Sequence, residues 1–336
     1  MGFRASTVMS SDDAHRSPVG APLSTQTRGI ESFEELKGVV KTARTEVTQI
    51  DRGHLHGRLT HALIGGLPLD LGTFSLGVRS RGVVSEDRIT IGMLTDCTNR
   101  VTHWSYEMRP GDVVVWPAKG EHDARYYGGA SVAVISLSPS DVTSIFGSEP
   151  QLKDPGAWTR SHHRPAGRAS AHTIRLLQKV IARFEAKGVE LSADSAEFWR
   201  RAITEAMTAP ILQDCSSDID GPLPSALRIV NKVEDYFESN ETRPLHISEI
   251  CSALHVSRRT LHRAFHDGIG LGPVAFLRRK RLCSVHKILR SSDPMTTNVA
   301  RIAMDYGFAN LGRFSGDYRQ LFDEYPSQTL AAGRRN

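Results

Sequence analysis

The stretch HISEICSALHVSRRTLHRAF (residues 246–265) decides how the C-terminal third of the chain folds. Its first half has apolar residues at i, i+3, i+4 and i+7, which predicts a helix with one buried stripe. These residues are Ile247, Ile250, Cys251 and Leu254. After Val256, Ser257 is a suitable N-cap for a second helix that would bury Leu261, Ala264 and Phe265. Two short helices joined by a tight turn form a helix-turn-helix.

The outer face of the second predicted helix is basic and carries Arg258, Arg259, His262 and Arg263. Such a face can lie in a major groove of double-stranded DNA, where an arginine fork meets O6 and N7 of guanine. A solvated face on an ordinary helical pair has the same composition, so this stretch alone leaves both interpretations open. If it binds DNA, we expect Arg259, His262 and Arg263 to contact base edges. Ser257 would cap the helix and reach a phosphate.

A second copy of the pattern favours the DNA-binding interpretation. Residues 297–322 read TNVARIAMDYGFANLGRFSGDYRQLF, with a helical apolar stripe, a turn at Gly307 and a second helix with apolar residues at i, i+4 and i+8. The candidate DNA contacts on this copy are Asn310, Gly312, Arg313 and Gln320, of which Gly312 offers only its backbone. Residues 273–290 read as one connecting helix, whose length is roughly 27 Å at about 1.5 Å per residue. Since one turn of B-DNA is roughly 34 Å, this helix can hold the two copies in successive major grooves.

Residues 221–336 resemble the DNA-binding region of AraC/XylS transcription regulators. The shared motifs are A-L-H-V-S-R-R-T-L-x-R-x-F at residues 253–265, I-A-x-x-x-G-F at 302–308, G-R-F-S-x-D-Y-R-x-L-F at 312–322 and P-S-x-T-L at 326–330. The resemblance implies two helix-turn-helix motifs (residues 246–266 and 297–323), a cupin-like sensor domain that binds an effector, and no enzymatic activity. Double-stranded DNA, a second copy of the chain and, for an activator, RNA polymerase are the implied partners.

Three positions depart from the family pattern. His255 stands at a turn where Gly is common, Gly316 replaces a frequent Arg, and Asp323 stands where Gly usually ends the helix. His tolerates the left-handed backbone conformation better than most residues. The glycine costs its helix about 1 kcal/mol and removes a side chain from the reading face. We therefore expect the second copy to contribute less to sequence specificity than the first.

The basic residues are concentrated in the region that carries the two motifs. The chain has 42 Lys and Arg and 37 Asp and Glu, and residues 221–336 hold 17 and 11 of these, which gives +6 there and −1 elsewhere. This asymmetry is the electrostatic pattern of a phosphate-binding surface.

The length of 336 residues predicts two or three domains. Residues 1–28 are rich in Ser, Thr, Gly and Pro and have no apolar segment, which predicts a disordered tail without a signal peptide. No apolar run approaches the roughly 18 residues of a membrane helix, so no membrane contact is expected. Four widely spaced cysteines favour a reducing cytoplasm, with Cys251 and Cys283 as buried thiols beside Cys97 and Cys215.

Residues 29–156 predict a β-rich effector-binding domain. Short apolar runs separated by Gly, Pro, Asp and Asn suggest a small barrel or sandwich. The segments at residues 109–112, 116–117 and 120–122 resemble the second motif of cupin barrels. The H-x-H element of the first cupin motif is missing and His103 and His122 stand alone, so neither a bound metal nor catalytic residues are expected.

A basic cluster is the candidate effector site of this domain. Arg79 and Arg81 share one face of a predicted strand, and Arg88 follows the next turn. If that face lines the barrel interior, the arginine forks suit an anionic effector; an exposed charged face is the alternative. A cyclic dinucleotide would offer two phosphates and two bases on which Arg can stack, and a sugar acid or other carboxylate is the alternative ligand.

A helical pair over residues 169–214 is predicted between the two domains, after a linker at residues 157–168. The first helix has Ile174, Leu177, Ile181 and Phe184 at heptad-like spacing, so the pair can close on itself or form the seam of a homodimer. The predicted fold is α+β multidomain: an N-terminal β-rich cupin-like barrel, a central helical pair and a C-terminal all-α domain with two helix-turn-helix motifs.

Three classes of function compete. A sequence-specific transcription regulator, an activator under effector control, explains the duplicated motif, the charge asymmetry and the β-rich front. A cupin-type enzyme tethered to DNA lacks its metal ligands. A non-specific architectural DNA-binding protein is the third class. Its affinity for one DNA sequence would be close to its affinity for any other, measured at the same salt concentration. The first class is our prediction.

Overall fold

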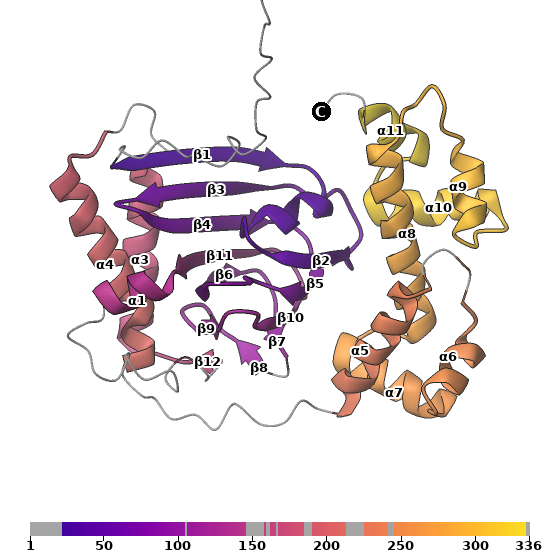
Figure 1. The fold of residues 1–336 in the computed structure, drawn as a ribbon. Coiled ribbons are helices and arrows are strands. Elements are labelled where there is room, and N and C mark those ends of the chain that lie inside the picture. Colours follow the sequence, from indigo (N-terminus) through magenta and orange to yellow (C-terminus); the bar gives the residue numbers. More distant parts are fainter. Residues whose placement is uncertain are drawn as a thin grey trace, which may run out of the picture.

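The computed structural model describes residues 22–104, 106–145, 158, 162–165, 167–184, 190–212, 225–240, 243 and 245–333. It has the predicted α+β architecture, with a β-rich N-terminal domain, a helical pair on one side of it and a C-terminal helical domain on the other (Figure 1). No helix in these ranges is long and apolar enough to cross a membrane.

The β-rich domain is built from two antiparallel sheets. The first has seven strands in the order β1 (Leu23–Ile30), β3 (Gly57–Ile64), β4 (Leu67–Phe74), β11 (Ala130–Leu137), β6 (Ile89–Cys97), β9 (Val113–Trp116) and β12 (His162–His163). The second has five strands in the order β2 (Arg44–Gln49), β5 (Val78–Val83), β10 (Glu121–Tyr126), β7 (Val101–His103) and β8 (Tyr106–Met108). Alternating side chains from both sheets fill the space between them, as in a β-sandwich.

The structure corrects two predictions at the borders of this domain. The predicted tail extended to residue 28, but β1 begins at Leu23 and pairs with β3 from Leu23↔Ile64 to Ile30↔Gly57. Most of β1 is exposed, so it lacks the apolar alternation that marks a strand in sequence. The predicted linker at residues 157–168 contains β12, which pairs with β9 through His162↔Val114. Residues 1–21 lie outside the described part of the chain.

The helical pair covers one side of the seven-stranded sheet. Helices α3 (Gly167–Phe184) and α4 (Ala193–Leu212), together with α1 (Pro139–Ile145), lie at the side away from the C-terminal domain (Figure 1). Leu177 of α3 and Met207 of α4 pack in one apolar cluster with Ile135 of β11. The pair therefore closes partly on its own sheet.

The C-terminal domain contains two helical pairs joined by a long helix. The first pair is α6 (Ile247–Ala253) and α7 (Arg258–Ile269), and the second is α9 (Val299–Asp305) and α10 (Leu311–Phe322). The long helix α8 (Pro273–Ser291) runs between them, and α5 (Ser225–Glu238) and α11 (Pro326–Ala332) complete the domain. The apolar residues of the two sequence copies form the core, including Leu261, Phe265, Phe314, Tyr318 and Phe322.

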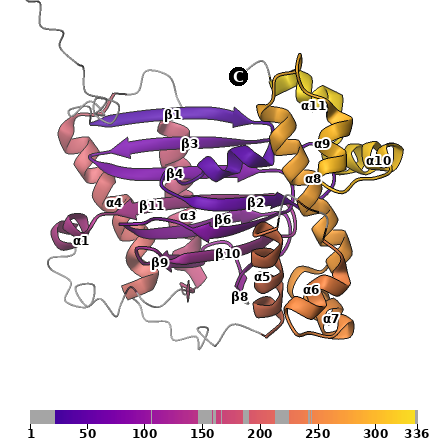
Figure 2. The same cartoon turned by 45° about the vertical axis from the view of Figure 1, so that its right-hand side comes forward.

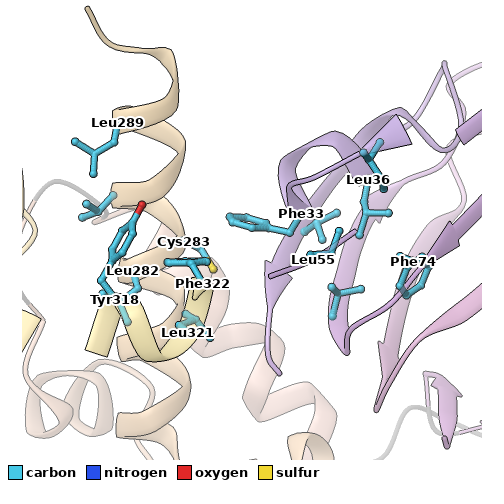
Figure 3. Close-up of a cluster of buried hydrophobic side chains, with 14 of the residues drawn as sticks. Phe33, Leu36, Leu55, Phe74, Leu282, Cys283, Leu289, Tyr318, Leu321 and Phe322 are labelled. Carbon is cyan, nitrogen blue, oxygen red and sulfur yellow. The ribbon is translucent and has the colours of Figure 1, made fainter. Parts of the chain in front are cut away.

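The two domains dock through α5, α8 and the C-terminal ends of α7 and α10, while α6 and α9 lie on the outer side (Figure 2). A short 3-10 helix, η2 (Phe33–Gly38), supplies Phe33, whose ring stacks on Phe322 with 5.9 Å between centroids. Phe33 projects from the β-rich domain toward Phe322 and Cys283 (Figure 3). The backbone carbonyl of Leu321 accepts a hydrogen bond from Gln49 Nε2 at 2.8 Å. The interface thus has its own buried apolar and polar contacts.

Candidate DNA interface and sensor cavity

The first helical pair presents a basic face on α7. His255 in the turn adopts the left-handed conformation with φ of 52°. Ser257 caps α7 by accepting a hydrogen bond from the Thr260 backbone N–H at 3.0 Å, as the sequence predicted. The candidate DNA contacts Arg258, Arg259, His262 and Arg263 are all exposed. Their only carboxylate contact within the described chain is a loose 3.8 Å pair between Arg263 and Asp267, so the guanidinium groups are available to DNA.

The second helical pair presents a sparser face on α10. Asn310 Oδ1 accepts a hydrogen bond from the Arg313 backbone N–H at 2.9 Å, which makes Asn310 the N-cap of the helix. Gly312, Arg313 and Gln320 are exposed. Asp323 ends the helix with φ of 60°, a conformation that explains why Gly is common there. A methyl group at Gly316 would meet nothing within 4 Å, so this part of the face is open.

Helix α8 fixes the two faces relative to each other. Most of its residues are buried, including Phe276, Leu282, Val285 and Leu289. Pro273 stands in its first turn, where a missing N–H does no harm. Because α8 packs on both helical pairs, α7 and α10 are held as one rigid unit.

The β-rich domain encloses a cavity of about 100 Å³ between its two sheets. Its wall comes from both sheets and from the segment that begins with η2, and is mostly aliphatic and aromatic. The side chains with polar groups in the wall are Lys37, Thr45, Ser80, His103, Trp116, His122 and Tyr126. A cavity of this kind suits a small apolar molecule with a few hydrogen-bonding groups.

A buried histidine cluster closes one part of this cavity. His103 Nδ1 lies 2.7 Å from His162 Nε2, while its Nε2 accepts a hydrogen bond from Trp116 Nε1 at 3.3 Å. The rings of His103 and His122 are 5.2 Å apart. The expectation that His103 and His122 stand alone is therefore wrong, because strands distant in sequence pair and bring them together. His162 was missed because it lay in the predicted linker.

Burial keeps these histidines neutral. It lowers the pKa of His122 to about 4, with a further contribution from the nearby Arg79 charge. Burial and the neighbouring imidazoles also hold the pKa of His103 well below its usual range. His122 Nδ1 is buried and has no hydrogen-bond partner in the described structure. Among the described residues, no group of three or more His, Cys, Asp or Glu side chains is placed to bind a metal ion.

The candidate effector arginines do not line this cavity. Arg79 and Arg81 share one face of β5, as their spacing predicted, but the cavity is lined by Val78 and Ser80 from the other face. Arg88 lies in the turn before β6, where its backbone N–H donates to Ser85 Oγ at 3.2 Å. The premise that these arginines face the barrel interior is therefore wrong.

The arginines instead face helix α5 of the C-terminal domain. Arg79 forms buried ion pairs with Asp123 at 3.0 Å and Glu234 at 2.7 Å. Arg81 pairs with Asp235 at 2.7 Å in a more exposed position. The acidic partners on α5 are far away in sequence, so the sequence could not indicate this role. An anionic effector at Arg79 would have to displace these carboxylates.

Comparisons with known proteins found similar sequences and structures. Residues 250–332 match a helix-turn-helix domain family. The chain is 26% identical to XylDLEGF operon transcriptional activator 1 of Pseudomonas putida over 281 residues, 83% of this chain and 85% of that protein. It is 34% identical to a probable thc operon regulatory protein of Rhodococcus erythropolis over 109 residues, 32% of this chain and 33% of that protein.

The solved AraC-like transcriptional activator CuxR aligns at 14% identity over 77% of this chain and 94% of its own, with a TM-score of 0.42. The helix-turn-helix match at residues 250–332 and the similarity to a transcriptional activator over 83% of the chain support the prediction of an AraC/XylS-type transcription regulator.

Proposed function

We propose that this protein is an effector-controlled transcriptional activator that places α7 and α10 in two successive major grooves of its operator. One observation carries the proposal. Helices α7 and α10 both begin with a capping side chain and expose a polar face, and the buried helix α8 joins their two helical pairs. Base contacts are assigned to Arg259, His262 and Arg263, and phosphate contacts to Ser257 and Arg258. The matching activators of Pseudomonas putida support activation rather than repression.

A footprinting experiment tests this assignment. Hydroxyl-radical footprinting of the full chain on its own promoter should protect two patches on one face of the duplex, about 10 base pairs apart. Protection of a single patch would show that α10 is structural only. Equal affinity for operator and random DNA at the same salt concentration would favour the architectural function instead.

We infer that the effector binds inside the β-rich domain, in the cavity of about 100 Å³. An engineered cavity of about 150 Å³ is known to hold benzene, so a small molecule of about one ring is the appropriate size. The apolar wall favours a largely apolar ligand, and the unpartnered His122 Nδ1 offers it one hydrogen bond. His122 is neutral near pH 7, so this contact suits a hydroxyl, carbonyl or protonated acid group.

The anionic effectors expected from Arg79 and Arg81 fit this cavity less well. A cyclic dinucleotide is far larger than the cavity, and a sugar acid would leave several hydroxyl groups against aliphatic side chains. Both stay predictions, and each would need a site outside the cavity.

Two elements connect the cavity with the DNA-binding domain and support effector control. In β5, Ser80 faces the cavity while its neighbour Arg79 holds Glu234 of α5. In the η2 segment, Leu36 lines the cavity while Phe33 stacks on Phe322. A ligand that favours one position of these elements would shift the arrangement of the two domains, provided its affinity differs between the arrangements.

The effector is best identified by purifying the protein from its host and analysing bound small molecules by mass spectrometry. A substitution that fills the cavity tests whether the effector binds there. Val132 lines it, so Val132→Phe should abolish the transcriptional response and retain operator affinity, whereas Val132→Ala should retain both. A full response from a folded Val132→Phe protein would place the effector elsewhere.

We also propose a homodimer through α3 and α4, with RNA polymerase as the partner of the DNA-bound state. Leu177 is turned into the sheet, and the side chains of Ile181 and Phe184 lie outside the described residues. Phe198 of α4 is 63% exposed and is the best remaining anchor. Sedimentation of the full chain tests this: Phe198→Asp should convert a dimer to a monomer, and a monomeric wild type at tens of micromolar would refute the dimer.

A further inference from the structure

A cleft of about 380 Å³ lies between the two domains, beside the turn from α7 to α8. The β-rich domain contributes the loop after β2 and the end of β10, and the C-terminal domain contributes the end of α7 and the start of α8. The residues that matter here are Arg52, Arg125, Arg279, Tyr127, Asp51 and Gly270. The cleft is separate from the apolar cavity, and none of these residues lines that cavity.

Three arginines but only one carboxylate, Asp51, line this cleft. Arg125 is buried with 5% exposure, and Arg279 is half-buried. Arg125 Nη1 donates to the Tyr126 carbonyl at 2.7 Å, but its Nε is buried without any partner. Within the described chain, Arg52, Arg125 and Arg279 form no salt bridge, whereas Arg79 nearby has two carboxylates. Buried charges in proteins are normally paired, so this arrangement is suited to binding an anion.

The electrostatics of Arg125 and Arg279 agree with an anion-binding site. The pKa of Arg125 is lowered to about 10, mainly by burial; Tyr127 and Asp51 oppose this effect, and the charges of Arg279 and Arg79 add to it. Burial and the charge of Arg52 also lower the pKa of Arg279. Asp51 is the nearby acid, and its Oδ2 already accepts a hydrogen bond from the Gly77 N–H at 2.8 Å.

Tyr127 organises the cleft. The guanidinium carbon of Arg125 lies 4.5 Å from the centroid of the Tyr127 ring, which holds the planar fork in place. The same ring closes on the other domain, because a methyl group at Gly270 would lie 3.6 Å from it. A fixed guanidinium fork is pre-organised for two oxygens of one carboxylate or phosphate.

We propose that Arg52, Arg125 and Arg279 bind the carboxylate or phosphate group of a small anionic molecule, and that this anion holds the sensor domain against the DNA-binding domain. Arg52 and Arg125 belong to one domain and Arg279 to the other, so one anion bridges both. A free anion is favoured over a DNA phosphate because Gly270 follows the C-terminal end of α7, whereas Ser257 and Arg259 stand at its N-terminal end. The arginines of this cleft form no salt bridge in the described chain, whereas Arg79 and Arg81 are paired with carboxylates.

Calorimetric titration of the full chain with inorganic phosphate, and separately with acetate, tests the site. We expect saturable binding of phosphate to the wild type, weakened about tenfold by loss of one charge-assisted contact in Arg52→Gln or Arg279→Gln. Arg109→Gln removes an exposed arginine of the same domain outside the cleft and should leave binding unchanged. Arg125→Gln should abolish binding, and circular dichroism shows whether that buried variant folds. Equal phosphate affinity in the wild type, Arg52→Gln and Arg279→Gln would overturn the proposal.

A second measurement, the salt dependence of operator affinity, distinguishes a free anion from a DNA phosphate. It does not depend on whether the apolar cavity binds an effector. The dependence of operator affinity on salt should be the same for the wild type and Arg52→Gln if the cleft takes a free anion. If the slope of log K against log salt falls by about one in Arg52→Gln, the arginine neutralises a DNA phosphate and the proposal is wrong. Phosphate should also raise the temperature at which the two domains separate in the wild type, and not in Arg279→Gln.

Discussion

Arg79 of β5 and Glu234 of α5 form an ion pair of 2.7 Å across the domain interface, and both side chains are almost completely buried. Asn231 and Asp123 complete the surroundings of the guanidinium, with Asn231 Oδ1 accepting from Arg79 Nη2 at 2.9 Å. Burial alone would lower the pKa of Arg79, but Glu234 and Asp123 raise it above its usual value. The charge is therefore permanent, and the contact joins the sensor strand directly to the DNA-binding domain.

Removing this arginine should separate the domains. Arg79→Ala leaves Asp123 buried without its cation and leaves Glu234 with only the more distant Lys280 at 3.7 Å, and removing one partner of a buried pair typically costs about 3–5 kcal/mol. We expect differential scanning calorimetry to show two transitions in the variant and one in the wild type. Arg81→Ala is the matched control, because its partner Asp235 is 58% exposed and such pairs contribute about 1 kcal/mol or less. Equal effects of the two substitutions would contradict a special role for Arg79.

The first reading helix should carry most of the sequence specificity. Arg263 is exposed, and its contact with Asp267 is weak, so Arg263→Ala has little effect on folding. We expect it to cost about 1–3 kcal/mol on the cognate operator and to relax the preference at one base pair. Binding selection against a randomised operator measures both. A uniform loss on all sequences would reassign Arg263 to a phosphate contact.

The local features of the DNA-binding domain could be predicted from sequence because their causes are local. Ser257 caps α7 through a neighbour three residues away, and His255 takes the left-handed conformation inside a turn of fixed length. The buried positions of both copies follow from helical spacing alone. The burial of Cys283 was also predicted, whereas Cys251 is only half-buried.

The features that depend on distant segments could not be predicted. The orientation of Arg79 depends on Glu234, which belongs to another domain. The histidine cluster depends on the pairing of β10 with β7, through Ala124↔His103, and on the short strand β12. The cavity has the same aliphatic residues as a filled core, and side-chain pattern does not reveal whether such residues meet or leave a void.

Asn310 in the second reading helix has a structural role besides the DNA contact that the sequence predicts. Its side-chain oxygen caps α10, so Asn310→Ala should destabilise the helix by about 0.5–2 kcal/mol. Asn310→Ser retains an acceptor and should restore most of the stability and the operator affinity. Thermal unfolding and operator titration of both variants measure this. If Asn310→Ser binds the operator as poorly as Asn310→Ala although its stability is normal, Asn310 contacts DNA directly.

The docking of the two domains should also depend on pH through His286 of α8. Its Nδ1 lies 2.6 Å from Glu34 of the sensor domain, and its Nε2 lies 3.2 Å from Glu324. Burial opposes a charge here, but the hydrogen bonds and charges of Glu324 and Glu34 outweigh it and raise the pKa of His286. A raised pKa means that the charged imidazole stabilises the folded, docked state.

The direction of the pH effect follows from the raised pKa of His286. The stabilisation is fully present below the ordinary histidine pKa of about 6.5 and is lost as the pH rises through the raised pKa of the folded protein. We expect the separation temperature of the domains to fall as the pH rises from about 6.5 through the raised pKa of His286 in the wild type. His286→Gln keeps a hydrogen-bonding side chain but cannot titrate, so its separation temperature should be lower at pH 6 and nearly independent of pH over that range. If the separation temperature depended on pH in the same way in the wild type and in His286→Gln, the imidazole would be neutral over the whole range. Glu34 and Glu324 would then not stabilise a charged His286.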